Sequence, residues 1–328
     1  VTGATGFIGI EVSKQLAVQG KIPRLMVRRP LRGIMLKNLA AEIMQADLRS
    51  PPSLKRILEG VDTLIHLGAR AAFEPYPRLY PSIVEGSMAL LRAGIEAGIR
   101  NFVFGGSLLV YNNTPAGIGP ETPPNPDSCY GKAKLEAENQ LARMALQAGV
   151  RFVSLRLPHI YGAHSLLFDQ VRRGRVFFPG SGNNLFAHLH VSDAARALIA
   201  AAEGRIEGSH VVADELSCTW NELFETLRAY YPRMRVLHVP QSLAYLGARL
   251  LALYFGLTRS ANPYPSGAVR CWNLQLPVVP GSLQRLLGLT PQFPSIHDGI
   301  PNVLDDSISF YWLPSNLDLS LIHISDPT

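Results

Sequence analysis

The chain has 328 residues, of which 47% are hydrophobic and 17% are charged, so it holds enough apolar material for a globular core. Its formal net charge is +6, but the basic residues are dispersed, and the clusters at 28–32 and 172–175 are too short to form a nucleic-acid-binding stripe. The composition therefore excludes a disordered chain and argues against a nucleic-acid partner. The basic residues are either solvated surface charge or the binding partners of an anionic small molecule. A small molecule is therefore the expected ligand.

Cysteine content and hydropathy indicate the compartment. The three cysteines, Cys129, Cys218 and Cys271, leave one unpaired in any disulfide scheme and lack metal-ligand spacing. No secretion signal is recognisable, and the longest apolar stretch, 243–257, contains Arg249 and is shorter than a membrane-spanning helix. We expect a cytoplasmic protein without a transmembrane span, and leave peripheral membrane contact open.

Short apolar runs alternate with helix-length segments over the first 155 residues. The pattern predicts helices over 9–19, 53–58, 84–97 and 130–148, and strands over 23–27, 63–67, 101–104 and 152–155. Such alternation is typical of βαβ units in an α/β, doubly wound parallel sheet of the Rossmann type. Ligands of such sheets bind beyond the carboxyl ends of the strands.

After residue 156 the alternation ends, and the predicted helices over 193–203, 220–230 and 241–255 are separated by longer loops. We predict a Rossmann domain over 1–155, its first strand truncated because the chain opens directly on a glycine loop. Residues 156–318 form mainly a smaller, interleaved substrate-binding lobe, from which a strand near 209–212 returns to the sheet. Residues 319–325 resemble a translated sequencing adapter, so 319–328 is expected to be a non-native tail.

The opening residues form a G-x-x-G-x-x-G pattern between a strand remnant and an amphipathic helix. Gly3 permits a tight turn, Gly6 lets backbone N–H groups approach a pyrophosphate, and Gly9 allows the helix to pack closely on the strand. Glycines also serve ordinary turns, but this placement favours dinucleotide binding. The predicted contacts to an NAD(P) cofactor in this loop are Gly3, Thr5, Gly6, Phe7, Ile8 and Gly9.

The end of the second strand bears on the choice of cofactor. An acidic side chain there would bind the ribose 2′-hydroxyl of NAD, whereas this chain has Arg28 and Arg29. Arginine pairs well with a 2′-phosphate, so we expect NADP to be preferred to NAD, with solvated arginines as the alternative. Asp47 and Leu48 are expected beside the adenine. The strand end Leu67, Gly68 and Ala69 is expected beside the cofactor channel.

The candidate catalytic residues are Tyr130, Lys134 and Ser107. The i, i+4 spacing places Tyr130 and Lys134 on one helical face. A phenol has a pKa near 10, and we expect the neighbouring ammonium to lower that pKa and permit proton exchange with a substrate oxygen. Ser107 follows a strand and could orient the same oxygen. The alternative is that Tyr130 and Lys134 are ordinary surface residues of a helix. Their occurrence together with Ser107 and the glycine loop disfavours it.

Together these motifs resemble the extended short-chain dehydrogenase/reductase family, also called the NAD-dependent epimerase/dehydratase superfamily. The resemblance extends to about Trp312 and includes these motifs: the glycine loop, 67–69, 105–107 with Val110-Tyr111, 130–134, 156–162 and 190–193. It implies hydride transfer at a nicotinamide, with Tyr130 as acid/base, Lys134 bound to the ribose and to Tyr130, and Ser107 polarising the oxygen. It also implies that the backbone of Pro158, His159 and Ile160 borders the carboxamide.

One position departs from the family pattern, because Ile83 stands where an asparagine is usual. This puts the proton relay through that asparagine in doubt but leaves the tyrosine–lysine pair intact. His188 and His190 share a face of a predicted strand without further ligands, so no metal site is expected. Cys129 lacks an activating neighbour in the sequence and is expected to be a packing residue rather than a nucleophile.

The sequence indicates the substrate less clearly than any other property of the protein. The apolar helix predicted over 241–255, followed by residues 257–259, resembles the 3β-hydroxysteroid dehydrogenase and dihydroflavonol-reductase branch, which implies a sterol- or flavonol-like alcohol or ketone. Residues 166–168 are apolar and are expected where the substrate enters, and packing of the helix on its own lobe is the alternative. A nucleotide-sugar epimerase or dehydratase is the leading alternative, and the arginines over 172–175 favour it because they could bind a diphosphate. A non-catalytic NAD(P)-binding sensor is the second alternative, although it would need none of the catalytic residues. A homodimer is left open.

Overall fold

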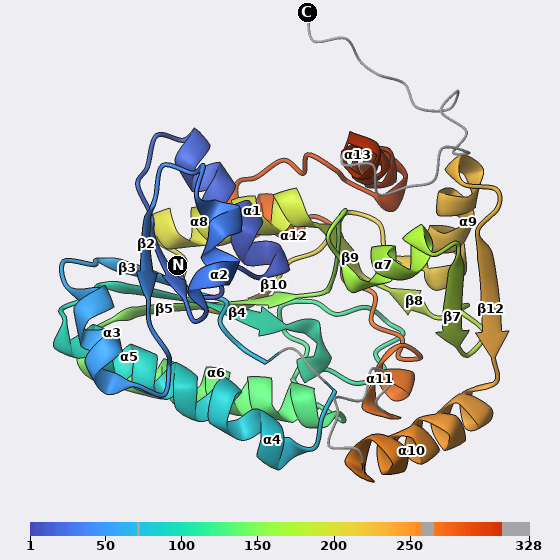
Figure 1. Cartoon of the computed structure of the whole chain (residues 1–328), viewed down its shortest axis with the longest axis horizontal. Helices are drawn as coiled ribbons and strands as arrows, with labels where there is room; N and C mark the ends of the chain where they lie inside the picture. Colours follow the sequence, from blue (N-terminus) through green and yellow to red (C-terminus); the bar gives the residue numbers. More distant parts are fainter. Residues whose placement is uncertain (71–72, 258–265, 310–328) are drawn as a thin grey trace, which may run out of the picture.

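The computed structural model describes residues 1–70, 73–257 and 266–309. It confirms the α/β fold: a parallel sheet with helices on both faces, and a second lobe beside the carboxyl ends of the strands (Figure 1). The strands are β1 (Arg24–Val27), β2 (Glu42–Gln45), β3 (Thr63–His66), β4 (Asn101–Ser107), β5 (Arg151–Leu157), β6 (His159–Tyr161), β7 (Arg175–Pro179), β8 (Leu185–Phe186), β9 (His188–His190), β10 (Gly208–Val211), β11 (Cys218–Thr219) and β12 (Arg235–Val239). The helices are α1 (Phe7–Val18), α2 (Pro30–Gly33), α3 (Pro51–Leu58), α4 (Tyr76–Tyr80), α5 (Gly86–Glu96), α6 (Cys129–Ala148), α7 (Leu166–Arg172), α8 (Val191–Glu203), α9 (Trp220–Tyr230), α10 (Gln241–Leu257), α11 (Ser266–Cys271), α12 (Ser282–Leu287) and α13 (Ile296–Ser309).

The main sheet has the strand order β10-β5-β4-β3, and all its pairs are parallel. Val1 and Thr2 join it to the parallel β1–β2 pair. The Thr2 N–H donates to the Ile65 carbonyl at 3.0 Å, and the Met26 N–H donates to the Val1 carbonyl at 2.9 Å. The chain therefore runs outward to β2 on one side of residues 1–2 and returns to β3 on the other. This reversal is the switch point where doubly wound sheets bind their ligands.

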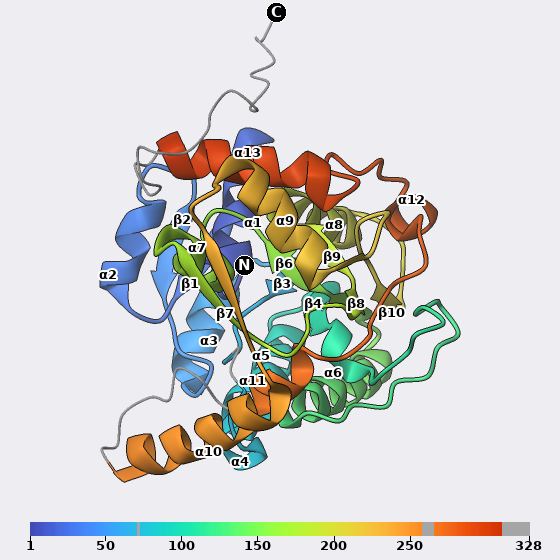
Figure 2. The ribbon, with the colours of Figure 1, turned by 90° about the vertical axis from the view of Figure 1, so that its right-hand side faces the viewer.

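Helices cover both faces of the sheet. Helices α1 and α8 pack together on one face, and α3, α5 and α6 pack on the other (Figures 1 and 2). The buried residues of the strands explain why helices cover both faces of the sheet. In β4 every residue after Asn101 is buried, and Phe102 faces the α5–α6 layer, whereas Val103 faces the α1–α8 layer. A near-continuous apolar run of this kind is expected of a strand buried on both faces.

The second lobe is built around a separate aromatic core. It contains the short pairs β6–β9, β7–β12 and β8–β11, with α7, α9 and α13 packed around them. Trp220, Phe178 and Phe224 are fully buried at its centre. The capping box at the start of α9, in which Thr219 and Glu222 bond each other's backbone N–H groups, places Trp220 at the first helical position.

Most predicted elements of residues 1–155 are present with small changes at their ends, and a strand at Gly208–Val211 pairs with β5. The sequence did not predict β2, which is an edge strand with largely exposed side chains. It also missed β6, β7, β8, β11 and β12, because strands of two to five residues carry too little periodicity, whereas the strand expected at His188 and His190 is present as β9. The expected tail over 319–328 lies outside the described residues.

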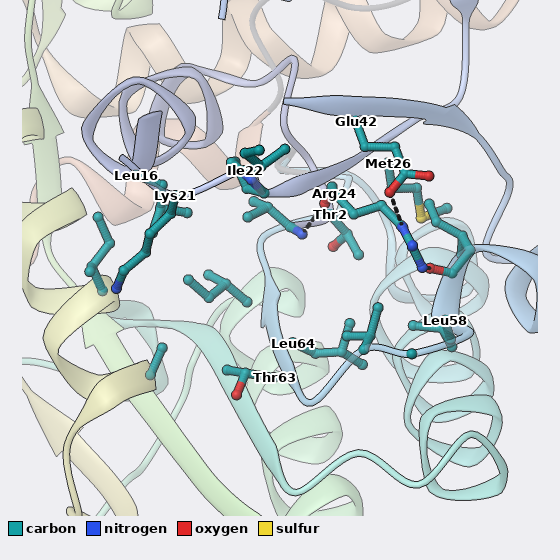
Figure 3. Close-up of a pocket in the computed structure, with 18 of the residues that line it drawn as sticks. Thr2, Leu16, Lys21, Ile22, Arg24, Met26, Glu42, Leu58, Thr63 and Leu64 are labelled. Atoms are coloured by element: carbon teal, nitrogen blue, oxygen red, sulfur yellow. Dashed lines mark hydrogen bonds and ion pairs between the residues drawn. The ribbon is translucent and has the colours of Figure 1, made fainter. Parts of the chain in front are cut away.

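A cavity of about 380 Å³ lies at the amino ends of β1 and β3, and Val1 and Thr2 are among the residues that line it (Figure 3). Leu16, Ile22, Met26 and Leu64 are among the side chains that line it, and an Arg24–Glu42 ion pair of 2.7 Å crosses its rim. Burial lowers the pKa of the Val1 amine, which lies here, to about 5. Because parallel sheets bind ligands at the opposite edge, we do not assign the active site to this cavity.

Candidate active site

A second cavity, of about 580 Å³, lies beyond the carboxyl ends of β3, β4 and β5. It brings together most of the site residues predicted from the sequence, although they come from five separate stretches of the chain. Those that line it are Gly3, Gly6, Phe7, Ile8, Gly9, Leu67, Ala69, Ser107, Tyr130, Lys134, Pro158, His159 and Ile160.

The glycine loop is held in the geometry that phosphate binding requires. Gly3 has a φ of +69°, and a Cβ there would lie 2.7 Å from the Leu67 carbonyl carbon. A Cβ at Gly9 would overlap the Gly3 carbonyl oxygen. Gly6 caps α1 without a side-chain hydrogen bond, so the first N–H groups of the helix remain available at the cavity. The dipole and the free N–H groups together make this an anion site that fits a dinucleotide pyrophosphate.

The remaining predicted cofactor residues do not line the cavity. Arg28 and Arg29 are exposed just beyond β1, at the same edge of the sheet, and no ion pair to either is present among the described residues. Thr5 lies in the loop but outside the lining, and the Gly68 N–H donates to the Thr2 hydroxyl at 3.1 Å.

Asp47 and Leu48 are engaged elsewhere. Arg49 forms a two-point contact with Asp47, Nη2 to Oδ2 at 2.9 Å and Nε to Oδ1 at 3.1 Å. These hydrogen bonds lower the pKa of the Asp47 carboxyl. Leu48 packs against Gly86, where a Cβ would lie 3.2 Å from the leucine Cβ. Their expected contact with adenine stays a prediction.

Tyr130 stands in the first turn of α6. Ser128 caps the helix by accepting a hydrogen bond from the Gly131 N–H at 2.9 Å, which fixes where the helix begins. The phenol ring meets Phe73 edge-on, with centroids 6.1 Å apart. Burial raises the pKa of Tyr130 to about 12. The expectation of a lowered pKa was therefore wrong for the chain alone, because desolvation of the phenolate is the one cause of the shift and no effect of Lys134 opposes it.

Lys134 is buried one turn further along the same face of α6. Its Nζ donates to the Gly105 carbonyl at 2.7 Å and lies 4.4 Å from the centroid of the Phe104 ring. Burial lowers the pKa of Lys134 to about 8, against the opposing effect of the Glu138 carboxylate. The ammonium is thus held mostly charged at neutral pH, inside the cavity and beside β4.

Ser107 ends β4 and is 8% exposed at the cavity. Its Oγ accepts a hydrogen bond from the Leu109 N–H at 3.2 Å, which caps a short 3₁₀ turn over Leu108–Val110. The hydroxyl proton remains available for a ligand oxygen. Ser107 therefore has the position and the donor that its predicted role needs.

A buried ion pair that the sequence did not single out supports the helix that carries Tyr130. Glu138 accepts from Arg156 Nη2 at 2.6 Å and from the Ser154 hydroxyl at 2.6 Å. Arg156 also donates to the Tyr111 hydroxyl at 2.6 Å. Glu138 lies four residues after Lys134, and that i, i+4 spacing was the signal that could have revealed it. This network of hydrogen bonds connects α6, the helix that carries Tyr130 and Lys134, to β5.

His66 links the glycine loop to the helix that follows β3. The Ser87 hydroxyl donates to the Ile83 carbonyl at 2.6 Å, so His66 Nε2–H donates to Ser87 at 2.8 Å. The Thr2 hydroxyl then donates to His66 Nδ1 at 2.6 Å. Burial and the Lys134 charge lower the pKa of His66 to about 3, so the imidazole stays neutral. Ile83 itself is fully buried and offers only its backbone carbonyl to this chain.

The far wall of the cavity is aromatic and was not predicted from the sequence. It is formed by Phe73, Phe186, Trp220 and Trp272. Trp220 and Trp272 stack with centroids 4.9 Å apart and an interplanar angle of 16°. These four residues are spread over 200 positions and several elements, so no local pattern could have associated them. None of the described residues that line the cavity is an arginine, and Lys134 is the one lysine among them.

The histidines near the cavity are packed on this aromatic wall. The Nδ1 atoms of His159 and His188 lie 2.9 Å apart, and His159 meets Trp220 edge-on. Burial lowers the pKa of both, to about 4 for His159, so one neutral ring donates to the other. His190 accepts from the Ser192 N–H at 3.2 Å and caps α8.

The substrate-facing residues expected from the sequence are only partly in place. Leu167 lines the cavity and Phe168 is buried beside it. No described residue of α10 lines the cavity, so the helix whose resemblance implied an apolar substrate is not part of the cavity wall. Arg173 and Arg175 are exposed and lie outside the lining. The side chains of Leu166 and Arg172 lie outside the described residues.

Comparisons with known proteins agree with this geometry. A model of the NAD dependent epimerase/dehydratase family matches residues 1–213. A ceramide reductase of Caulobacter vibrioides is 27% identical over 326 residues, which cover 97% of this chain and 96% of that protein. A vestitone reductase of Medicago sativa is 27% identical over 281 residues, covering 76% of this chain and 86% of that protein.

Solved structures share the fold at lower identity. MoeE5 in complex with UDP-glucose and NAD superposes with a TM-score of 0.76, covering 94% of this chain and 98% of that one. The two sequences are 23% identical, so this likeness establishes the architecture alone.

Proposed function

The chain belongs to the NAD-dependent epimerase/dehydratase family, within the extended short-chain dehydrogenases/reductases, and from this premise we propose that it reduces a ketone on a largely apolar substrate. It is an NAD(P)-dependent oxidoreductase by family. The apolar substrate, the reductive direction and the roles of the individual residues are our proposals. So are the division into domains over 1–155 and 156–318, a cytoplasmic location and a homodimeric state.

The site fits a nicotinamide dinucleotide. The cradle formed by Gly3 and Gly9, which any Cβ would fill, would hold the pyrophosphate against the first N–H groups of α1. Lys134 would hold the ribose, and the backbone of Pro158 to Ile160 would border the carboxamide. When bound, the reduced cofactor supplies the hydride.

The chain's own side chains carry out the proton transfer. With a pKa of about 12 the Tyr130 phenol is protonated at neutral pH, so it can donate to a ketone oxygen as that oxygen gains charge. The charged Lys134 ammonium stabilises the phenolate that remains, and Ser107 donates a hydrogen bond to the same oxygen. A protonated Tyr130 is the form that acts as the proton donor in the reductive direction.

The aromatic wall is the observation that supports an apolar substrate. A nucleotide-sugar brings two phosphate charges, which proteins meet with arginines, lysines or helix N-termini. The described lining of this cavity beyond the cofactor cradle has no arginine, and Lys134 is already bonded to Gly105. Burying apolar rings against Phe186, Trp220 and Trp272 would instead contribute about 25 cal/mol for each Å² removed from water.

A thermal-shift screen with NADPH present tests the substrate class. We expect sterols, flavonoid ketones and ceramide-like ketones to raise the melting temperature, and UDP- and dTDP-sugars to leave it unchanged, because only the apolar ligands match the wall. Trp272→Ala, which changes a half-buried residue of the wall, should abolish the shift, whereas Phe177→Ala, an exposed aromatic residue outside the lining, serves as the control. Selective stabilisation by a nucleotide-sugar would reverse the assignment in favour of an epimerase or dehydratase.

Cofactor preference tests the two exposed arginines. We expect NADPH to bind more tightly than NADH, and Arg28→Ala/Arg29→Ala to reduce that preference about 10- to 100-fold, since a charge-assisted contact contributes about 1.5–3 kcal/mol. Arg143→Ala/Arg205→Ala removes the same charge from surfaces remote from the glycine loop and should leave the preference intact. Fluorescence titration of both cofactors measures it, and equal affinities in the unmodified protein would contradict the proposal.

A further inference from the structure

Helix α10 presents an apolar surface to solvent. Of the large apolar side chains that are exposed in the described residues, seven lie on this one helix: Leu243, Tyr245, Leu246, Leu250, Leu251, Leu253 and Tyr254. Ala248 is its one buried residue among those described. A helix that is apolar on almost every side is normally buried in protein or in lipid, and an exposed apolar patch of this size marks an interaction site.

The helix projects from the edge of the second lobe in both views (Figures 1 and 2). It packs on α11, and α11 in turn packs on Phe73, since a Cβ at Gly267 would lie 3.3 Å from the phenylalanine Cβ. Phe73, with Cys271 at the end of α11 and the adjacent Trp272, lines the substrate cavity. The apolar helix is therefore one helix away from the cavity wall.

We propose that α10 lies in the surface of an anionic lipid bilayer and holds the substrate cavity against it. The proposal deepens the proposed function, on which it rests in one respect: an apolar ketone partitions into the bilayer, from which a docked enzyme can take it directly. The proposed partner is therefore the membrane surface. The position of α10 would give the cavity access to substrates dissolved in the lipid.

Charge favours an anionic lipid surface over a second copy of the chain. Residues 241–257 contain no aspartate or glutamate, the exposed Arg249 is their one charged residue, and the chain carries a net charge of +6. The helix thus presents one positive charge and no negative one, and each basic residue near anionic headgroups is worth about 1 kcal/mol. Tyr245 and Tyr254, 44% and 59% exposed, are of the type that settles at the boundary between lipid and water.

The length of α10 decides how it meets the bilayer. Its 17 residues would extend about 26 Å, which is less than a hydrocarbon core requires. Among the described residues no helix is long and apolar enough to cross a membrane. The helix therefore lies along the surface, with its leucines in the boundary between headgroups and acyl chains.

Vesicle flotation of the full chain tests the docking without any substrate. We expect the protein to float with phosphatidylcholine vesicles that contain about 30% phosphatidylglycerol, an anionic lipid, and to float more weakly with vesicles of phosphatidylcholine alone. Leu246→Gln/Leu250→Gln/Leu253→Gln should weaken binding about 100-fold, because three leucines no longer enter the lipid. Leu31→Gln/Leu146→Gln/Leu216→Gln changes three leucines elsewhere that are at least as exposed and should bind as the unmodified protein does.

Analytical ultracentrifugation of the same variants separates the competing occupants. A dimer that only the α10 variant splits, together with no flotation, would overturn the proposal and assign the helix to an interface between copies. Equal flotation of the two triple variants would overturn the role of α10, and equal binding to both kinds of vesicle would overturn the anionic preference. Because flotation needs no turnover, failure here leaves the reductase assignment intact, and failure of the substrate screen leaves the docking result standing.

Discussion

Tyr130→Phe is expected to lower turnover about 1,000-fold while leaving the dissociation constant of NADPH nearly unchanged. The substitution removes only the phenol oxygen, which is the proposed proton donor, and general acid catalysis contributes about 10²–10⁴-fold to a rate. The ring and its contact with Phe73 remain, so the cavity keeps its shape. Steady-state kinetics on a ketone from the substrate screen, with a parallel NADPH titration, measure both quantities.

Tyr230→Phe is the matched control, because that tyrosine packs against the core of the second lobe and lies outside the cavity lining. It should retain full turnover. A Tyr130→Phe protein that kept more than about a tenth of the activity would remove Tyr130 from the mechanism.

Lys134→Met is expected to lower turnover about 100-fold and to weaken cofactor binding, because the ammonium stabilises the phenolate and would hold the ribose. The pH profile gives a second signature. Since burial lowers the pKa of Lys134 to about 8, the side chain is charged below that pH and neutral above it. Turnover of the unmodified protein should therefore fall as pH rises through about 8, and that fall should be absent from the residual activity of the variant.

Stability should move in the opposite direction to activity. The pKa of Lys134 in the folded protein lies below the model-peptide value of 10.5, so the buried charge destabilises the fold at neutral pH. Removing it should change the free energy of unfolding by between zero and a gain of about 3 kcal/mol, given about 1.4 kcal/mol for each pKa unit. Lys132→Met, an exposed lysine on the same helix, should change neither turnover nor its pH profile. Loss of stability in Lys134→Met would mean that the lysine is structural.

The sequence by itself predicted the glycine loop and the Tyr130–Lys134 pair, which the structure brings to one cavity, because these signals are local. The spacing of Gly3, Gly6 and Gly9 and the pair Tyr130–Lys134 each lie within one turn and one helix. Backbone sterics and helical periodicity act over such distances, so the residues could be read directly. The repeated alternation of apolar runs and helices likewise determined the parallel sheet, because every such strand is buried on both faces.

Only the tertiary structure decided the aromatic wall of the cavity. Phe73, Phe186, Trp220 and Trp272 meet across the cavity from four distant segments, and their association depends on how the short strands of the second lobe pair. It also decided the protonation of Tyr130, since the desolvation that raises its pKa depends on what packs around it and not on its neighbour four residues away.

The helix over 241–257 shows the limit of periodicity most directly. Its sequence predicted that it is helical and apolar, and the resemblance of this helix implied an apolar substrate. The structure places it on the outside of the second lobe, where it packs on α11 and Ala248 is its one buried residue among those described. Apolar composition indicates that a surface must be covered, but only the fold determines whether protein or another phase covers it.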